Sequence, residues 1–410
     1  MFRLLLVFLV FGLIDLYVYQ GLKQLWSHKL VFNLVYLAFS LAFYVWMILA
    51  INDVTDSWDQ EFAWYTYFRA FLFILIFAKI LALIPLFADD VRRGISYLIQ
   101  LFTKSRSEVV FADRNRFLIQ SALVLAGIPL FLLTYGMIRN PFRFKRRSLS
   151  VPIRKLPKDL EGLKIVQISD LHSGTFKNGS FFAEAIEIIN REQADLVFFT
   201  GDLVNNVADE ADSFLEYFSN IQSKYGVFSI LGNHDYGDYV QWASKEKKDE
   251  NFRKLCAQHQ KMGWQLLLNE HETLNINGHN INIIGVENYS ALPQFPKYGD
   301  LEKAKSGAPQ AGLNILLSHD PTHWDSKVAG KQKDIHLTLS GHTHGFQFGI
   351  EIPGFINWSP SQWVYKRWAG LYAENNQYLY VNRGLGCLAY PGRVGILPEV
   401  TVLKLQSNVS

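Results

Sequence analysis

Four long apolar stretches in the first third of the chain constrain the fold more than any other feature. They lie at Phe2–Tyr19, Leu30–Ile51, Ala70–Phe87 and Phe117–Met137. A helix needs roughly 20 apolar residues to cross a bilayer, and each stretch approaches or exceeds that length. No small-residue cleavage site follows Tyr19, which favours a span over a cleaved signal sequence. We therefore predict an all-α region of about four transmembrane helices over residues 1–139.

The charges between the spans predict the orientation of the chain. Four spans place the N-terminus, the loop Asn52–Tyr67 and everything after the fourth span on one side. That loop is acidic and has no Lys or Arg, whereas the loop before the fourth span is basic, which favours the cytoplasm for the basic loop. The acidic residues are Asp53, Asp56, Asp59 and Glu61, and the basic ones are Arg92, Arg93, Lys104, Arg106, Arg114 and Arg116. We expect an integral protein of a bacterial plasma membrane with its C-terminal domain on the extracytoplasmic side.

A basic segment follows the fourth span and opposes that orientation. Its charged residues are Arg139, Arg143, Lys145, Arg146, Arg147, Arg154, Lys155 and Lys158. They form either a patch for anionic lipid head groups or a solvated linker that only stops translocation. Three prolines interrupt any helix here, and we assign residues 140–162 to a basic linker.

Bulk composition excludes several classes of partner. A formal net charge of +3, without a Lys/Arg stripe interleaved with aromatics, indicates no nucleic-acid partner. The two cysteines, Cys256 and Cys387, are far apart and fit neither a disulfide framework nor a thiolate metal site.

From Leu163 onward, short apolar runs alternate with helical or loop segments, which is typical of an α/β domain over residues 163–410. The runs are continuous in Val, Ile, Leu and Phe, so the sheets should be covered on both faces. The segments Phe181–Arg191 and Ala211–Tyr225 read as intervening helices.

Five of these runs end in a turn that displays His, Asp or Asn side chains. The carboxyl ends of strands are where α/β sheets bind ligands, so turns that are far apart in sequence can converge on one point. Oxygen and imidazole donors without thiolate suit Mn, Fe, Zn, Ni or Co, and the set is large enough for two divalent ions. The candidate metal ligands are Asp170, His172, Asp202, Asn233, His319, His342 and His344.

The sequences of these turns resemble, in the same order, the motifs of the calcineurin-like metallophosphoesterase family. The family pattern is D-x-H, G-D, G-N-H-[DE], a lone His and G-H-x-H. The corresponding residues are Asp170-Leu171-His172, Gly201-Asp202, Gly232-Asn233-His234-Asp235, His319 and Gly341-His342-Thr343-His344. The chain is most similar to the membrane-associated bacterial branch with YkuE- and YaeI-type phosphodiesterases, because its ending, including Arg383-Gly384-Leu385-Gly386, is similar. The resemblance implies two packed mixed β-sheets flanked by helices.

The resemblance also implies a role for each residue. Asp170, His172 and His344 would hold the first metal ion, Asn233, His319 and His342 the second, and Asp202 would bridge them. A hydroxide between the ions would attack phosphorus. His234 would contact the phosphoryl oxygen and protonate the leaving group. Many relatives have an Asp where this chain has Asn205, which leaves Asp235 or another group to orient His234.

Two insertions are candidates for setting specificity. Tyr236–Met262 either caps the site or is a solvated helix. Pro353–Tyr372 contains Phe355, Trp358, Trp363, Tyr365 and Trp368 with two basic residues, and either contacts lipid or packs under a long loop. Arg383 and Arg393 are candidates for phosphate binding, or are surface residues.

The sequence thus predicts a membrane-anchored, metal-dependent phosphodiesterase whose partners are the bilayer and a phosphate-ester substrate. One alternative is a hydrolase of a lipid-linked pyrophosphate, of the UDP-diacylglucosamine type, because a membrane anchor raises the local concentration of a lipid-linked substrate. An alternative of another class is a non-catalytic metal-binding receptor or scaffold. Degenerate ligands would indicate that class, and none of the candidate ligands is missing.

Overall fold

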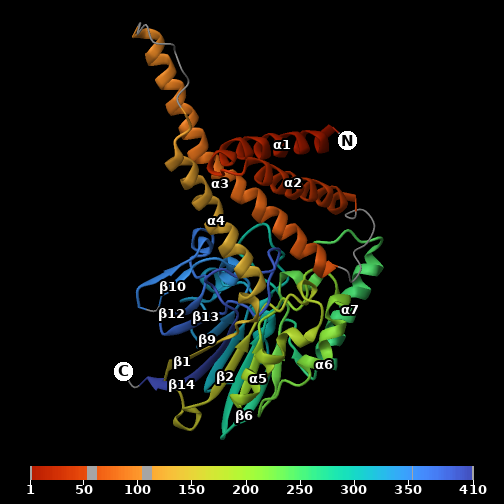
Figure 1. Ribbon diagram of the computed structural model, residues 1–410. Helices are drawn as coiled ribbons and strands as arrows, with labels where there is room; N and C mark the ends of the chain where they lie inside the picture. The colour runs from red at the N-terminus through yellow and green to blue at the C-terminus, as the bar shows by residue number, and fades with distance from the viewer. Residues whose placement is uncertain (1, 53–61, 104–112, 353, 409–410) are drawn as a thin grey trace. The chain divides into compact units, whose positions relative to one another are not determined.

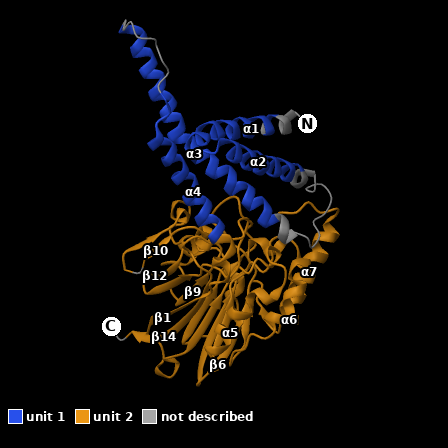
Figure 2. Ribbon diagram, viewed as in Figure 1, with its two compact units in different colours: residues 1–135 blue, residues 136–410 orange. Residues whose placement is uncertain are grey.

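The computed structural model describes residues 2–52, 62–103, 113–352 and 354–408. The chain forms two compact units, residues 1–135 and residues 136–410 (Figure 2). The first contains the predicted membrane helices and the second contains the predicted metal ligands.

The first unit is helical, as predicted. Its helices are α1 (Phe2–Leu22), α2 (Lys29–Asn52), α3 (Phe62–Phe102) and α4 (Arg116–Ile138). Among the described residues, three segments are long and apolar enough to cross a membrane: Lys29–Ile48, Thr66–Phe102 and Arg116–Ile138. The acidic residues Asp53, Asp56, Asp59 and Glu61, and the basic residues Lys104 and Arg106, lie outside the described residues.

Helix α3 corrects one predicted boundary. We expected the third span to end at Phe87, before the charged cluster, but α3 continues to Phe102. The helix accommodates these charged residues because they form ion pairs along it: Asp89 with Arg92 at 2.9 Å and Asp90 with Arg93 at 3.0 Å. Such pairs, three residues apart, lie on one helix face.

The second unit consists of two six-stranded mixed sheets, which confirms the predicted fold class. The first sheet has the order β1 (Lys145–Arg154), β14 (Glu399–Asn408), β2 (Lys164–Ile168), β3 (Leu196–Phe199), β4 (Val227–Ser229) and β5 (Gln265–Leu266). The second has the order β12 (Gly370–Glu374), β13 (Gln377–Val381), β9 (Leu337–Ser340), β8 (Leu313–Leu317), β7 (His279–Gly285) and β6 (Glu270–Ile276). A two-stranded ribbon, β10 (Ile350–Ile352) and β11 (Ile356–Trp358), stands apart from both.

The sheets pack face to face, and helices cover their outer faces. Alternate side chains of β2 divide between two cores: Ile165 packs between the sheets, whereas Val166 packs under the helices. The covering helices are α5 (Ala183–Arg191), α6 (Leu215–Phe218) and α7 (Lys245–Lys261) on the first sheet and α8 (Leu301–Lys305) on the second. Helices α5 to α7 lie on one flank of this unit and the β10–β13 strands on the other (Figure 1). The helix expected at Ala211–Tyr225 is shorter than predicted: its α-helical part is α6, which begins at Leu215 and ends at Phe218.

Part of the segment that we predicted to be a basic linker is a strand. β1 pairs in parallel with β14 along its whole length. Arg146 forms an ion pair with Glu192, and Arg147 forms one with Glu351 and one with Glu399. These charges are therefore paired within the unit, and neither the lipid patch nor the solvated linker describes Arg146 and Arg147.

Glu399 is the centre of the most buried of these networks. Its carboxylate accepts hydrogen bonds from Arg383 Nη1 at 2.6 Å and from Tyr380 OH at 2.5 Å. Burial raises the pKa of Glu399, but Arg383 and Arg147 overcome this effect and hold it below its usual value. The carboxylate is therefore ionised, and it joins β1, β13 and β14.

Replacing Glu399 with alanine should destabilise the second unit strongly. The Glu399→Ala substitution leaves the buried Arg383 without its main partner, and breaking a buried ion pair costs about 3–5 kcal/mol. Urea unfolding of the full chain in detergent micelles, followed by tryptophan fluorescence, measures this loss. Glu192→Ala is the matched control, because Arg146 is largely exposed and the pair should contribute at most about 1 kcal/mol. Equal effects of the two substitutions would contradict the prediction.

Candidate metal centre

The predicted ligands all follow the ends of strands. Asp170 and His172 follow β2, Asp202 follows β3, and Asn233 follows β4, all in the first sheet. From the second sheet, His319 follows β8, and His342 and His344 follow β9. Because the two sheets pack face to face, these ends meet at one edge. The structure thus brings the predicted residues of both sheets together.

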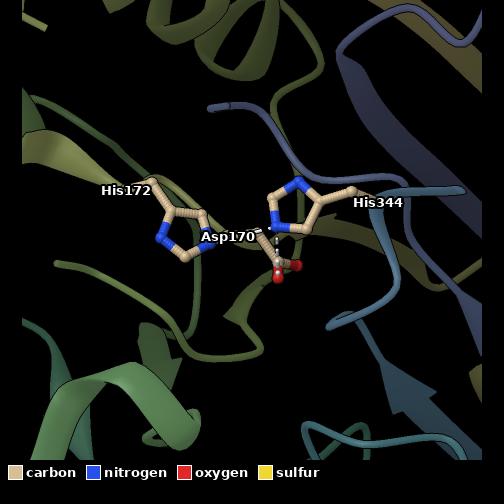
Figure 3. Close-up of side chains that lie close together, drawn as sticks. All are labelled: Asp170, His172 and His344. Atoms are coloured by element: carbon tan, nitrogen blue, oxygen red, sulfur yellow. Dashed lines mark hydrogen bonds and ion pairs between the residues drawn. The ribbon is translucent and has the colours of Figure 1, made fainter. Parts of the chain in front are cut away.

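One group contains Asp170, His172 and His344, whose side chains lie together in Figure 3. The Nε2 atoms of His172 and His344 are 3.0 Å apart, and His344 Nε2 lies 3.2 Å from Asp170 Oδ1. All three side chains are buried. Two imidazole nitrogens that face each other beside a carboxylate form a ready set of ligands for one cation.

A second group contains Asp202, His319 and His342. His319 Nε2 lies 3.1 Å from Asp202 Oδ2 and 3.3 Å from His342 Nδ1. The other nitrogen of His319, Nδ1, donates to the carbonyl oxygen of Thr200 at 2.6 Å. This hydrogen bond fixes the ring with Nε2 directed at the group, which is how proteins orient metal-binding histidines.

Asp202 and Asn233 complete the arrangement. Asp202 Oδ2 also lies 3.6 Å from His172 Nε2, so this carboxylate is close to a histidine of each group. Asn233 Oδ1 is buried and has no hydrogen-bond partner among the described residues, although its Nδ2 donates to Tyr239 OH at 2.9 Å. A buried acceptor without a donor is costly, and a cation would satisfy it. The donor set therefore fits two divalent ions.

The ionisation states suit this interpretation. Burial lowers the pKa of His172 well below its usual value and also lowers that of His342, so both are neutral near pH 7. Neutral imidazole is the form that binds metals. Burial also lowers the pKa of His319, but Asp202 overcomes this effect and raises it to about 10. A cation at this position therefore competes with a proton.

Backbone strain is concentrated in the same loops. Five of the seven candidate ligands have left-handed backbones, namely Asp170, His172, Asp202, His342 and His344. Each such non-glycine residue costs about 1–3 kcal/mol, and such strain gathers at functional sites. The motif glycines allow the close packing: a Cβ at Gly232 would lie 2.2 Å from Asp202 Oδ1, and one at Gly341 would lie 2.3 Å from Asp170 Oδ2.

His234 is oriented by a group that the sequence did not suggest. Its backbone N–H donates to Asp202 Oδ1 at 2.9 Å, and its ring Nδ1 lies 2.7 Å from the carbonyl oxygen of Asn205. Asp235 does not hold the ring, because it accepts backbone hydrogen bonds from Asp202, Leu203 and Gly232. The Asn205 carbonyl is therefore the other group that orients His234 in place of Asp235.

The loop that contains this carbonyl is itself held by a buried acid. Glu210 accepts hydrogen bonds from the backbone N–H groups of Asn205, Asn206 and Val207. Burial raises the pKa of Glu210 to about 7, although these hydrogen bonds oppose the shift. The side chain of Asn205 points elsewhere, since its Nδ2 donates to Thr175 Oγ1 at 3.1 Å.

Residues from both insertions reach the site. Tyr365 OH lies 2.9 Å from His342 Nε2, and Tyr239 contacts Asn233 as described. The helical part of the first insertion, α7, packs against the body through Gln258, which donates to the carbonyl oxygen of Ala208. Within the first insertion, Tyr239 therefore fits the role of capping the site, whereas α7 does not. The sequence marked these segments as candidates but gave no reason to select the two tyrosines.

The two arginines predicted to bind phosphate are structural, and neither is a surface residue. Arg393 is fully buried and donates to the carbonyl oxygens of Arg383, Gly384 and Gly386. Arg383 is buried against Glu351 and Glu399. Neither guanidinium is available to a substrate.

Two family models match the chain. Residues 2–141 match one described as "Probable Calcineurin-like phosphoesterase, transmembrane domain", and residues 163–346 match one described as "Calcineurin-like phosphoesterase". Together they cover most of the chain and both of its compact units.

Curated relatives agree with these matches. The chain is 29% identical over 318 residues to a transmembrane protein with metallophosphoesterase domain of Danio rerio, covering 75% of this chain and 67% of the relative. It is 29% identical to the metallophosphoesterase YkuE of Bacillus subtilis, covering 67% of this chain and 90% of the relative. A metallophosphoesterase of Campylobacter jejuni is 26% identical, and the similarity covers 98% of both chains.

Proposed function

Since the chain belongs to the calcineurin-like phosphoesterases, which are hydrolases of phosphate esters, we propose that it is a membrane-anchored phosphodiesterase. The observation that carries this proposal is the pair of buried donor groups that share Asp202 at the ends of strands from both sheets. The non-catalytic alternative is weaker, because every candidate ligand and His234 are present and oriented.

The contacts of the residues support the roles that the family resemblance implies. Asp170, His172 and His344 would hold one divalent transition-metal ion, and Asn233, His319 and His342 the other, with Asp202 shared between them. When bound, the ions would supply Lewis acidity and a water of lowered pKa as the nucleophile. Thr200 orients His319 through its carbonyl oxygen, and Tyr365 contacts His342.

His234 is the proposed general acid. With Nδ1–H donated to the Asn205 carbonyl, the doubly protonated ring would carry its second proton on Nε2 and deliver it from there to the leaving oxygen. The ring lies beside His172, with the ring centroids 5.0 Å apart, so it borders the first donor group. Its half-buried position gives a substrate access to it.

Hydrolysis of two chromogenic esters tests the proposal. Full chain in detergent micelles should hydrolyse bis(p-nitrophenyl) phosphate with Mn²⁺ and lose this activity with a chelator. We expect the diester to be preferred to p-nitrophenyl phosphate. Preference for the monoester would make the protein a phosphomonoesterase, and no turnover of either ester with Mn²⁺, Zn²⁺ or Co²⁺, despite bound metal, would favour the scaffold alternative.

A further inference from the structure

The second unit, residues 136–410, is here called the catalytic unit, and it has an exposed apolar surface beside the donor groups. Six large side chains, here called the apolar rim, are 42–83% exposed: Phe346, Phe348, Ile350, Ile352, Phe355 and Trp363. Single exposed apolar residues are ordinary, but so many on two neighbouring segments mark an interaction surface.

The β10–β11 ribbon turns its apolar face outward. Ile350 pairs with Trp358 and Ile352 with Ile356, so these side chains share one face. Glu351 lies on the opposite face, where it forms ion pairs with Arg147 and Arg383. The ribbon is thus fixed with its charged face toward the body of the unit and its isoleucines exposed. A ribbon on a water-facing surface would have its charged face exposed and its isoleucines buried.

The rim is joined to the end of a candidate membrane span. The span Arg116–Ile138 ends within the catalytic unit, where the carbonyl oxygen of Gly136 accepts a hydrogen bond from Arg393 N at 2.9 Å. The next residue, Val394, donates to the carbonyl oxygen of Gln347 at 2.7 Å and forms a bridge with Phe348. A Cβ at Gly136 would lie 2.7 Å from Val394 Cγ2, so the helix end and this loop are in close contact.

The residues around this junction have the character of a membrane interface. Arg139 and Arg143 follow the span and are exposed, and Lys366 is exposed beyond Trp363. Basic residues at the end of a span contact anionic head groups, Trp is enriched at the membrane interface, and Phe is typical of apolar faces that enter the head-group boundary. The rim therefore lies next to the end of the candidate span, residues 136–138.

Two residues of the rim are close in sequence to residues of the site. Phe346 lies two residues after His344, and Trp363 lies two residues before Tyr365, whose hydroxyl is 2.9 Å from His342 Nε2. If the rim entered the lipid head-group region, these neighbouring site residues would lie close to that region.

We propose that the apolar rim docks on the lipid bilayer next to residues 136–138, where the last span ends, and that the substrate is a phosphate ester carried by a membrane lipid. The apolar part of such a substrate stays in the bilayer while its phosphate reaches the donor groups from the head-group layer. The substrate class rests on the proposed phosphoesterase function, whereas the docking of the rim does not.

Fluorescence in lipid nanodiscs tests the docking alone. The full chain with Cys256→Ser receives one new cysteine, Phe355→Cys or Trp363→Cys, and an environment-sensitive nitrobenzoxadiazole label; the remaining Cys387 is buried. We expect blue-shifted emission that is quenched by spin-labelled phosphatidylcholine. Glu187→Cys on α5 is the control, because the Glu187 side chain is 62% exposed. A label at this position should show the red-shifted emission of an aqueous environment. Labels at 355 and 363 that match the control would overturn the docking. Shielding without lipid quenching, together with cross-linking between chains, would assign the rim to a second copy and also overturn it.

A pair of matched esters tests the substrate class. Hexadecyl p-nitrophenyl phosphate in the nanodisc and methyl p-nitrophenyl phosphate in solution have the same reacting groups. The double substitution Phe355→Ser, Trp363→Ser should lower kcat/KM for the hexadecyl ester by about tenfold or more, because two large apolar side chains no longer enter the lipid, and leave the methyl ester unchanged. Equal loss for both esters would overturn the membrane-presented substrate. If the unsubstituted chain hydrolyses neither ester, the proposed phosphoesterase function fails, and the fluorescence result still decides the docking.

Discussion

Replacing Asp202 with asparagine should abolish metal-dependent hydrolysis of bis(p-nitrophenyl) phosphate. Asp202 lies 3.1 Å from His319 and 3.6 Å from His172, and its carboxylate is thus close to a histidine side chain of each donor group. Asparagine keeps the shape of the side chain but removes its charge and one strong oxygen ligand. Residues that only orient ligands change metal affinity or activity by about 10–100-fold, so the loss of a shared ligand should exceed about 100-fold.

The same strand supplies a matched control for this experiment. Asp195 precedes β3, at the opposite end from Asp202, and accepts a hydrogen bond from the backbone N–H of Lys164 at 2.8 Å. Asp195→Asn makes the same chemical change away from the site and should leave turnover near that of the unsubstituted chain. Metal content, measured by mass spectrometry of the dialysed proteins, should fall only in Asp202→Asn. If Asp202→Asn kept two ions and full turnover, the two-metal assignment would be wrong.

The strands of the catalytic unit could be predicted because their signals are local. β3 is a continuous apolar run, β2 and β8 are mostly apolar, and all three strands are buried on both faces. β1 was missed, although Leu149, Val151 and Ile153 alternate as strand residues do. Its arginines and Pro152 suggested a linker, and the partners that neutralise the arginines, Glu192, Glu351 and Glu399, lie far away in sequence.

The same distinction applies to the site. The candidate ligands could be recognised because each motif places a donor directly after a strand, and strand ends of packed sheets converge. The partner of His234 could not be predicted, because every residue has a backbone carbonyl and no residue type identifies this one. Its position depends on the hydrogen bonds between Glu210 and the 205–207 loop, which only the folded chain shows.

Replacing His234 with alanine should reduce hydrolysis in a way that depends on the leaving group. A general acid contributes about 10²–10⁴-fold when the leaving oxygen needs a proton, and much less when the leaving group is already a stable anion. For His234→Ala we therefore expect kcat for an alkyl phosphodiester to fall by about 100-fold or more, and kcat for bis(p-nitrophenyl) phosphate to fall far less. Steady-state kinetics with both esters measures the difference.

Asn205→Ala separates the role of the carbonyl from that of the side chain. The ring of His234 contacts the backbone oxygen of Asn205, which alanine retains, so both esters should be hydrolysed at nearly the original rates. The lost hydrogen bond from Asn205 Nδ2 to Thr175 should cost only about 1 kcal/mol of stability. If Asn205→Ala reproduced the leaving-group effect of His234→Ala, the amide side chain would be the group that orients the acid. If His234→Ala slowed both esters equally, His234 would act on the phosphoryl group, because only proton donation to the leaving oxygen distinguishes the two esters.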